Sequence, residues 1–439
     1  MMKTDVHEML IDLDKKHFIH PTSSLKQQHE SGAPFIFSSG EGVYLTDTKG
    51  RKVLEGMSSL WNVNIGYGRK ELAEAAYEQM SKLAFTNSFS SMSNEPAIRL
   101  AAKLAELAPG NLNAVFFTSG GSESNDTAYK LARYYWKLKG LPDKKKIISQ
   151  KKGYHGVNIG ATSATGISPF HTLTNSPAPD FVHVDTFSID SLKACIEKEG
   201  ADNIAAFLTE PVQGAGGVNI APEGYLQEVR AICDEHNILL IADEVITGFG
   251  RTGKMFACEH YGVIPDLLLF AKGVTSGYIP LGGVMVTDAI HRELVERSDG
   301  TLLHGYTYSG HATACAVGLK NIEILERENL VENSRLMGEE LLNGFKELQM
   351  EFDFIGEVRA LGLIGAIEMV HPVTKQRFDS FIAPRVSEEA AKRGLIVRTV
   401  VFEGMDTIVF SPPLIINKQE VQELISIMRA ALAAVQAEL

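Results

Sequence analysis

The sequence predicts an α/β fold in which a mostly parallel sheet lies between two layers of helices and is joined to a smaller α+β domain. The middle of the chain repeats one theme: a short apolar run ends in polar or Gly residues and is followed by an amphipathic stretch, which is typical of parallel β-α units. The last part of the chain departs from this theme, because long helical stretches are followed there by several short strands. The 439 residues suffice for one large domain and a smaller companion.

The large domain is expected to contain six strands with helices between them. The predicted strands are Ala114–Phe117, Lys146–Ser149, Phe181–Val184, Ala205–Thr209, Ile238–Ala242 and Leu267–Phe270. The amphipathic stretches between them are long enough to be crossover helices that cover both faces of the sheet. These stretches are Ser122–Leu138, Asp190–Lys198 and Tyr225–His236.

The smaller domain is expected to draw on both ends of the chain. The tail predicts one long helix at Ala314–Leu348, then short strands, then a final helix at Lys418–Gln436. Near the N-terminus, alternation in Gly42–Asp47 and Lys52–Leu54 predicts a hairpin that can join the tail domain's sheet. The predicted tail strands are Ile355–Leu361, Leu363–Met369, Leu395–Arg398 and Thr407–Phe410. We therefore expect an N-terminal segment at 1–60 that contributes to the small domain, a large domain at 61–325 and a small C-terminal domain at 326–439.

Composition and charge argue against several classes of function. The chain has 42 basic and 54 acidic residues, a net charge of -12, which argues against nucleic acid as its main partner. The N-terminus lacks a continuous apolar core and no later run of about 18 apolar residues occurs, so we expect neither an export signal nor a membrane span. Four scattered cysteines without a C-x-x-C pair suggest neither zinc nor disulfides, and we expect a cytoplasmic protein.

Chemically useful residues follow several of the predicted strands. Ligands of open α/β sheets bind at the carboxyl ends of the strands, so these positions are where a site is expected. Residues 118–123, Thr-Ser-Gly-Gly-Ser-Glu, lie between a strand and a helix, where small residues and a helix N-terminus suit an anion. An ordinary Gly-rich turn with a Ser N-cap is the alternative interpretation of this segment.

A carboxylate and a lysine end two other apolar strands. Asp243 follows Leu239–Ala242, and an acid there can pair with a protonated heteroaromatic nitrogen or a metal, or simply cap the next turn. Lys272 follows Leu267–Ala271, and a lysine in a partly desolvated pocket loses its proton more readily, which suits Schiff-base chemistry. A strand-end lysine that stands alone is more often a solvated charge, but its pairing with Asp243 favours the chemical interpretation.

Two nucleotide-binding motifs are nearly matched by residues 248–254. Gly248, Gly250 and Gly253 satisfy G-x-G-x-x-G, but an Asp-Glu pair and further residues separate them from the strand, which argues against a dinucleotide site. The P-loop pattern fails at Met255, where a Ser or Thr should hold magnesium. A nucleotide-binding protein is therefore the least favoured alternative.

Together these motifs resemble the signature of the class III aminotransferases, which are fold type I enzymes that depend on pyridoxal 5'-phosphate (PLP). Asp243 and Lys272 stand 272 − 243 = 29 positions apart, with residues 247–253 between them. Further motifs match in order over nearly the whole chain, at residues 56–61, 66–67, 119–123, 153–156, 210–214 and 306–311. Within the class, the sequence is most similar to the ω-amino acid:pyruvate and amine:pyruvate transaminases.

The resemblance implies roles for residues around the cofactor. Lys272 would carry PLP as a Schiff base and shuttle the proton, and Asp243 would keep the pyridine nitrogen protonated so that the ring acts as an electron sink. Tyr154 would stack on the ring and Val245 would lie against its other face. His155 would orient Asp243.

The remaining implied cofactor residues hold the phosphate or complete the site. Gly121 and Ser122 would bind the phosphate, joined by Thr307 from a partner subunit, so the resemblance implies a homodimer with shared active sites, in which dimers can pair into tetramers. Gly120 and Glu210 are assigned to the same cofactor site. The implied reaction requires no metal.

The substrate pocket is expected to hold an aromatic wall and an arginine. Trp61 and Tyr154 would line it, and Arg398 matches the mobile arginine that binds a substrate carboxylate and can swing aside for an apolar group. Relatives that use 2-oxoglutarate commonly carry Arg where this chain has Val409 and Gln where it has Ile246, and both departures favour pyruvate.

The sequence therefore predicts a PLP-dependent ω-transaminase that moves an amino group from an ω-amino acid or amine to pyruvate by a ping-pong mechanism through pyridoxamine phosphate. The alternatives are a diaminopelargonate-synthase-like or other class III aminotransferase, and an aminomutase or decarboxylase on the same fold. A non-enzymatic PLP-fold protein is a further alternative, against which intact Lys272 and Asp243 argue.

Overall fold

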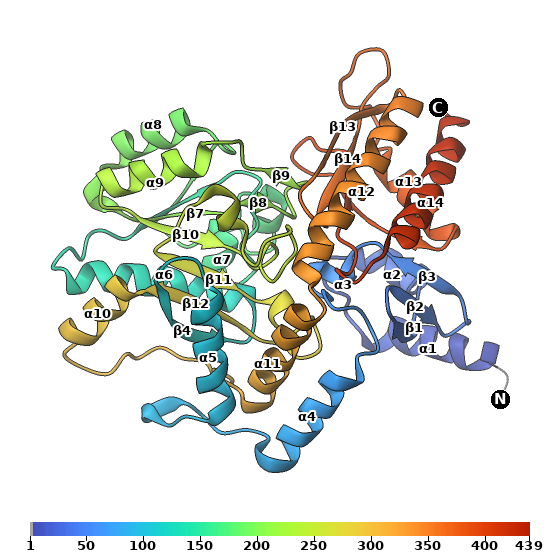
Figure 1. Cartoon of the computed structure of the whole chain (residues 1–439). Coiled ribbons are helices and arrows are strands. Elements are labelled where there is room, and N and C mark those ends of the chain that lie inside the picture. The colour runs from blue at the N-terminus through green and yellow to red at the C-terminus, as the bar shows by residue number, and fades with distance from the viewer. Residues whose placement is uncertain (1–2) are drawn as a thin grey trace.

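A seven-stranded mixed sheet forms the centre of the larger part of the molecule (Figure 1). The computed structural model describes residues 3–439. The strand order is β4-β12-β11-β10-β7-β5-β6. Its strands are β4 (Leu112–Thr118), β5 (Lys146–Gln150), β6 (Phe181–Val184), β7 (Ile204–Thr209), β10 (Leu239–Asp243), β11 (Leu267–Phe270) and β12 (Gly282–Thr287). The six strands expected from the sequence are confirmed, with ends that shift by one or two residues.

The seventh strand, β12, was not predicted from the sequence. It runs antiparallel to both of its neighbours, β11 and β4, whereas the pairs β10–β11, β10–β7, β5–β7 and β5–β6 are parallel. Added Cβ atoms at Gly282 and Gly283 would lie 3.0 Å from the Phe270 carbonyl oxygen and 2.4 Å from the Phe270 ring, so these two glycines let the strand pass close to β11. The sheet is therefore mostly parallel, as expected, with one antiparallel insertion.

Helices cover both faces of this sheet and make a three-layer sandwich. Along β10, Leu239 and Ile241 pack against α6, while Leu240 packs against the opposite helices, as the alternation of side chains in a strand requires. On the first side lie α6 (Gly121–Leu138), α7 (Ile159–Ala164) and α10 (Asp288–Arg297), and on the second lie α8 (Ile189–Glu199) and α9 (Tyr225–Glu235). A third group of helices, α4 (Lys70–Leu83), α5 (Glu95–Leu107) and α11 (Ala312–Arg327), packs near β4.

A second, antiparallel sheet organises the C-terminal part of the chain. Its order is β13-β14-β17-β16, with β13 (Ile355–Ala360), β14 (Gly365–Met369), β16 (Arg398–Val400) and β17 (Thr407–Phe410). The helices α12 (Leu330–Glu351), α13 (Ala383–Lys392) and α14 (Lys418–Gln436) accompany it. The prediction of a single helix at Ala314–Leu348 is wrong. The helix is interrupted between α11 and α12, where Asn329 has a φ of 51°, which a right-handed helix does not allow.

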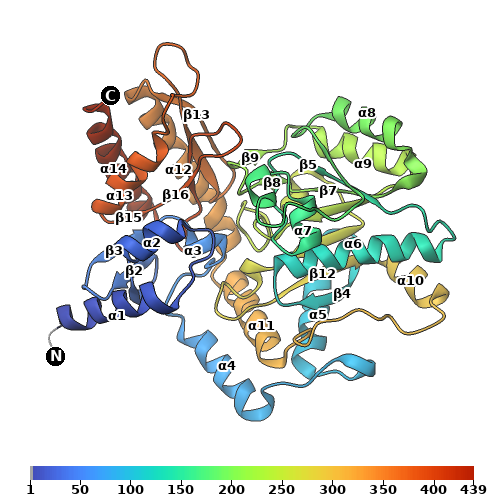
Figure 2. The same ribbon diagram turned by 180° about the vertical axis from the view of Figure 1, so that it is seen from behind.

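The predicted N-terminal hairpin is present and pairs with the C-terminal part of the chain. The hairpin of β2 (Tyr44–Asp47) and β3 (Lys52–Glu55) carries β1 (Phe37–Glu41) on one side and, in parallel, β15 (Leu395–Ile396) on the other (Figure 2). This makes a third sheet rather than an extension of the second. The strand predicted at Leu395–Arg398 is therefore divided, because β15 belongs to the third sheet and β16 begins the second. The expected division of the chain at residues 60 and 325 stays a prediction.

The loop at residues 248–253, which nearly matched nucleotide-binding motifs, ties the parts of the molecule together. It is followed by a short 3-10 turn at Ala257–Tyr261, and no long helix begins in it. The side chain of Arg251 is fully buried and donates four hydrogen bonds of 2.6 to 3.1 Å. Its acceptors come from both ends of the chain and are the carbonyl oxygens of Leu363 and Pro412, Ser58 Oγ and Asn64 Oδ1.

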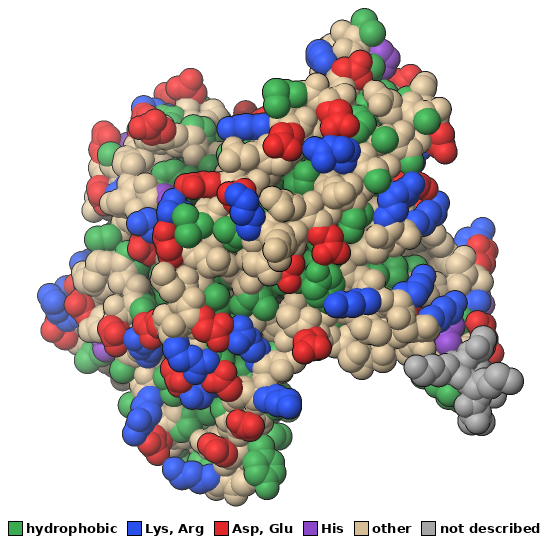
Figure 3. Space-filling model, turned by 45° about the vertical axis from the view of Figure 1, so that its right-hand side comes forward, with side chains coloured by type: hydrophobic (Ala, Val, Ile, Leu, Met, Phe, Trp, Pro, Cys, Tyr) green, Lys and Arg blue, Asp and Glu red, His purple; other side chains and the backbone are tan. Residues whose placement is uncertain are grey.

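The remaining elements are short or peripheral. On the face shown in Figure 3, Lys and Arg side chains are interspersed with Asp and Glu side chains. Among residues 3–439, no helix combines the length and apolar character that crossing a membrane requires. The short or peripheral elements are α1 (Lys3–His17), α2 (Leu25–Ser31), α3 (Ser58–Trp61), β8 (Val212–Gln213), β9 (Asn219–Ile220) and 3-10 turns at Phe89–Ser91, Ser168–His171, Ala201–Asn203 and Lys272–Val274.

Candidate active site

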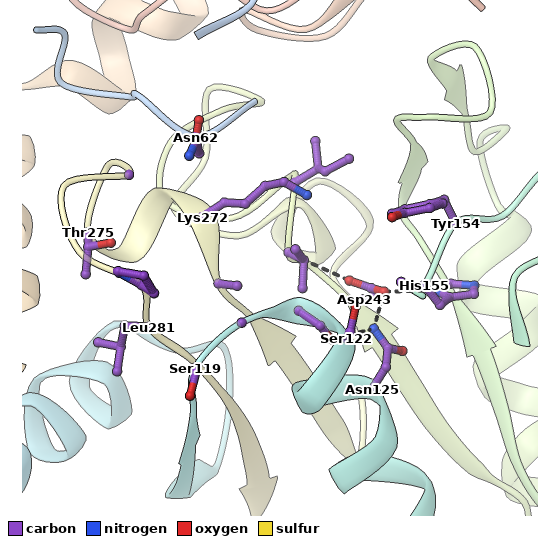
Figure 4. A pocket seen from close by; sticks show the side chains of 18 of the residues that line it. Asn62, Ser119, Ser122, Asn125, Tyr154, His155, Asp243, Lys272, Thr275 and Leu281 are labelled. Carbon is purple, nitrogen blue, oxygen red and sulfur yellow. Dashed lines mark hydrogen bonds and ion pairs between the residues drawn. The ribbon is translucent and has the colours of Figure 1, made fainter. Parts of the chain in front are cut away.

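A cavity of about 300 Å³ lies where β4, β10 and β11 end (Figure 4). Its position agrees with the rule that ligands of open α/β sheets bind beyond the carboxyl ends of the strands. Nine of the residues that the sequence singled out line it. They are Gly120, Gly121, Ser122, Tyr154, His155, Glu210, Asp243, Val245 and Lys272.

Lys272 projects into this cavity from the turn that follows β11. Its φ of 44° lies in the left-handed region, which residues other than glycine adopt rarely, and such strained residues cluster at functional sites. Burial lowers the pKa of the Lys272 amine, while the negative charges of Asp243 and Glu210 oppose this shift and the positive charge of Arg398 adds to it. A neutral amine is the form that attacks a carbonyl group, so the site favours the reactive form of the lysine.

Asp243 is the last residue of β10 and is held by three hydrogen bonds. Its Oδ2 accepts from Nδ1 of His155 at 2.8 Å and from Nδ2 of Asn125 at 2.9 Å, and its Oδ1 accepts from the Val245 backbone at 3.1 Å. Because a carboxylate can only accept, Nδ1 of His155 carries the hydrogen. These bonds fix the carboxylate at the cavity wall, and Figure 4 shows Asp243 between His155 and Asn125 with Lys272 across the cavity.

Asn125 and Tyr129 belong to this network and were not predicted. The Tyr129 hydroxyl donates to Asn125 Oδ1 at 2.9 Å, and both side chains are buried on the inner face of α6. Residues Gly121, Asn125 and Tyr129 are spaced four apart, so they lie one above another on one side of the helix. The spacing of Asn125 and Tyr129, four and eight residues after Gly121, was the feature of the sequence that could have identified them.

The glycine turn at the start of α6 presents a helix N-terminus to the cavity. Gly120 is the N-cap residue, and α6 is 18 residues long, so its free N–H groups and dipole suit an anion such as a phosphate. Ser122 Oγ accepts from the Val157 backbone at 3.1 Å. Gly156 faces Ser122 so closely that an added Cβ would lie 2.2 Å from Ser122 Oγ, which fixes a glycine at that position.

Glu210 anchors the segment that carries Tyr154. Its carboxylate accepts from the backbone N–H of Tyr154 at 2.8 Å and of Gly214 at 3.1 Å. Burial raises the pKa of Glu210, and the nearby His155 opposes that rise. The Tyr154 ring packs against Phe170, with 5.1 Å between the ring centroids. Glu210 therefore holds Tyr154 in place from behind.

Trp61 and Arg398, which were predicted to bind substrate, come together although they lie far apart in the sequence. The guanidinium carbon of Arg398 lies 5.0 Å from the centre of the Trp61 ring, in the range of a cation–π contact. Burial lowers the pKa of Arg398, and Tyr154 opposes this shift. Neither Trp61 nor Arg398 lines the cavity of Figure 4 directly, but their neighbours Asn62 and Ile246 do.

Thr307 lies apart from this cavity, in an exposed turn. A separate and larger hollow of about 1230 Å³ lies nearby, and residues from the segments 88–93 and 300–305 line it, without Met92. Apolar side chains around it are open to solvent, among them Phe89, Ile98 and Leu303, which is 93% exposed. Within one chain, Thr307 therefore contacts none of the other predicted cofactor residues.

Known proteins resemble this chain along almost its whole length. The sequence profile described as Aminotransferase class-III matches residues 26–432. A putrescine–pyruvate aminotransferase of Pseudomonas aeruginosa is 40% identical over 439 aligned residues, which cover 96% of this chain and 95% of that protein. A solved transaminase from the marine bacterium Virgibacillus has 53% identity and a TM-score of 0.97, covering 98% of this chain and 99% of the other. A thermostable (S)-enantioselective ω-transaminase from Thermomicrobium roseum has 45% identity and a TM-score of 0.93, covering 98% of each chain.

Proposed function

The chain belongs to the class III aminotransferases, which depend on PLP, and from this premise we propose that it is an ω-transaminase that moves amino groups from ω-amino acids or amines to pyruvate. The observation that carries the proposal is one cavity in which a lysine of lowered pKa faces a fixed carboxylate and a helix N-terminus.

The residues of the cavity fit PLP in each of its chemical parts. Gly120, Gly121 and Ser122 would bind the phosphate at the start of α6, because their backbone N–H groups are free there. Asp243 would pair with the pyridine nitrogen, because its carboxylate lines the cavity and is held there by hydrogen bonds that Asn125 and His155 donate to Oδ2. Tyr154 and Val245 would lie against the two faces of the ring.

PLP supplies an electron sink that stabilises negative charge on the substrate carbon next to the amine. The protein supplies the base and the geometry. Lys272 would hold the cofactor through Nζ, and the same Nζ, when free, would be the base that takes the proton from the substrate carbon next to the amine. Burial lowers the pKa of the Lys272 amine, which makes it easier for the amine to act in its neutral, proton-accepting form. We propose two such half-reactions, the second with the keto acid.

The preference for pyruvate rests on the apolar surroundings of Trp61. Val409 and Ile246, where relatives that use 2-oxoglutarate commonly carry Arg and Gln, are both buried in one cluster with Trp61. Such a cluster offers no charge for a second carboxylate. Arg398 lies over the Trp61 ring, where its guanidinium can bind one carboxylate, which suits an acceptor with a single carboxylate.

We also propose a homodimer in which Thr307 reaches the phosphate site of the partner subunit. The exposed apolar side chains around the 88–93 and 300–305 hollow support it, because an apolar patch of this kind usually marks an interface. Light scattering on the purified protein tests it. A dimer that Leu303→Glu converts to monomer, with loss of activity, would support the shared site, and a fully active monomer would exclude it.

The experiment that tests the proposed function is a visible spectrum of the wild type and of Lys272→Ala, both supplied with PLP. We expect a lysine-dependent band that is lost with β-alanine or 1-phenylethylamine and returns with pyruvate. A band that returns only with 2-oxoglutarate would overturn the assigned acceptor. A protein without such a band would overturn the proposed function itself.

A further inference from the structure

The segment that carries Trp61 is a turn of unfavourable backbone conformation. Ser58, Ser59 and Trp61 have φ values of 46°, 60° and 56°, although none of them is a glycine. Such conformations persist only where the surrounding structure enforces them, and they cluster at functional sites. Asn62, the next residue, lines the cavity. Neighbouring residues must therefore hold the Ser58–Trp61 turn in this conformation beside the cavity.

The carboxylate of Glu55 holds the turn from beneath. Glu55 is the last residue of β3 and is 1% exposed. Its Oε1 accepts from the backbone N–H of Met57 at 3.0 Å, and its Oε2 accepts from the backbone N–H of Ser59 and from the hydroxyl of Tyr67 at 3.1 Å. All three partners are donors, and the carboxyl group offers them two acceptor oxygens, whereas the amide of a glutamine of the same shape offers only one.

Glu55 is also fixed to the strand that leads to Arg398. It is the register partner of Ile396 in the β3–β15 pair, and the N–H of Gly56 donates to the Ile396 carbonyl oxygen at 2.9 Å. Arg398 follows two residues later and lies over Trp61. The two segments that carry Trp61 and Arg398 thus both begin at the C-terminal end of β3, one by continuing the chain after Glu55 and the other by pairing with it.

The Trp61 indole N–H has no hydrogen-bond partner among the described residues, although the side chain is 3% exposed. An unpaired buried donor is unfavourable, so local hydrogen bonding does not explain the position of this ring. The position follows instead from the turn beneath it. Arg251 adds a second hold on that turn, because its Nη2 donates to Ser58 Oγ at 3.1 Å.

We propose that Glu55 is a positioning residue for substrate selection, which acts by holding the Ser58–Trp61 turn so that Trp61 and Arg398 together recognise the carboxylate of an ω-amino acid. The inference rests on the proposed function of this site. It assigns to Glu55 no contact with the reacting atoms.

The test compares Glu55→Gln with Asp47→Asn in the donor half-reaction alone, without keto acid. Asp47 is the control, because it is a buried carboxylate of the same sheet that accepts backbone N–H bonds from Lys49 and Arg51, besides a bond from Arg51 Nε at 2.6 Å, and residues 47–51 do not line the cavity. Loss of the visible band is followed against the concentration of β-alanine, which carries a carboxylate, and of 1-phenylethylamine, which carries none.

For Glu55→Gln we expect the half-saturating concentration of β-alanine to rise about tenfold, with the limiting rate and the visible band retained and with less than about a threefold change for 1-phenylethylamine. Asp47→Asn should leave the ratio of the half-saturating concentrations of the two donors unchanged, even if its melting temperature falls as much as that of Glu55→Gln. Glu55→Asp, which keeps two acceptor oxygens, should lie between wild type and Glu55→Gln, and it serves if Glu55→Gln does not fold.

Two results would overturn the inference. One is an equal loss for both donors in the Glu55 variants, and the other is a donor ratio that shifts as much in Asp47→Asn. A wild type that reacts with neither donor would instead count against the proposed ω-transaminase, so the two failures are distinguishable.

Discussion

Replacing Gly156 by alanine should weaken the binding of PLP, because the new methyl group would occupy space that the phosphate turn uses. An added Cβ would lie 2.2 Å from Ser122 Oγ and 2.8 Å from both Cα and Cβ of Ser122. A rotation of the Ser122 side chain cannot relieve a contact with its own Cα, so the first turn of α6 must shift. The φ of 111° at this position adds backbone strain to the overlap.

The free-energy cost of replacing Gly156 by alanine has two parts. Backbone strain costs on the order of 1–3 kcal/mol and affects stability whether or not PLP is bound. Overpacking typically costs a further ~1–3 kcal/mol, and this part falls on the turn proposed to bind the phosphate. If binding must reverse that displacement, the dissociation constant of PLP rises by roughly five- to a hundredfold.

The assay titrates apoprotein with PLP and follows the visible band, with Gly140→Ala as the control. Gly140 follows the other end of α6 and has a φ of 81°, but nothing lies within 4 Å of its added Cβ, so only strain should be felt there. The melting temperature should fall in both variants, whereas PLP affinity should fall only in Gly156→Ala. Equal PLP affinity in the two variants would refute the assignment of this turn to the phosphate.

Three further substitutions probe the carboxylates and the buried arginine. Asp243→Asn should retain the visible band but slow the donor half-reaction about a hundredfold or more in stopped-flow measurements, since it removes a charge fixed at the reacting site. Arg251→Met should lower the free energy of unfolding by about 3–5 kcal/mol in urea titrations, because it removes four buried hydrogen bonds and leaves the acceptors unpaired. Burial raises the pKa of Glu55 from 4.5 to about 7, and the backbone hydrogen bonds from Ser59 and Met57 oppose this rise. The folded state therefore binds this proton more tightly, so a stabilisation of about 3 kcal/mol is present below pH 4.5 and is lost as pH rises through 7. Glu55→Gln should flatten unfolding free energy against pH in that window, and an unchanged slope would contradict the assignment.

The sequence was most informative where side-chain periodicity is strong. The strands around Leu240 and Leu268 are continuous apolar runs because both of their faces are buried, so they were predictable. β12 escaped notice because its first two residues are glycines, which normally indicate a turn, and here they allow close approach to Phe270. The break at Asn329 is a single backbone rotation inside an otherwise helical pattern, and periodicity does not reveal it.

For the site, family motifs identified the residues at strand ends that line the cavity, but not the residues that position other side chains or turns through hydrogen bonds. Asp243 and Lys272 could be paired from their spacing and their neighbours. Asn125 and Glu55 could not, because an amide inside a helix and an acid at the end of a short strand have many ordinary explanations. Their importance depends on contacts across more than 100 residues for Asn125 and on local backbone geometry for Glu55.

The division of one predicted strand into β15 and β16 has a consequence for engineering the protein. The chain leaves the N-terminal sheet at Ile396 and enters the C-terminal sheet at Arg398, so the proposed substrate arginine stands at a seam between two independently paired sheets. Leu395 and Ile396 are the register partners of Leu54 and Glu55, so the pairing of β15 with β3 fixes where the chain enters β16. Substitutions in β3 (Lys52–Glu55) should therefore change the discrimination among substrates without altering a residue of the seven-stranded sheet.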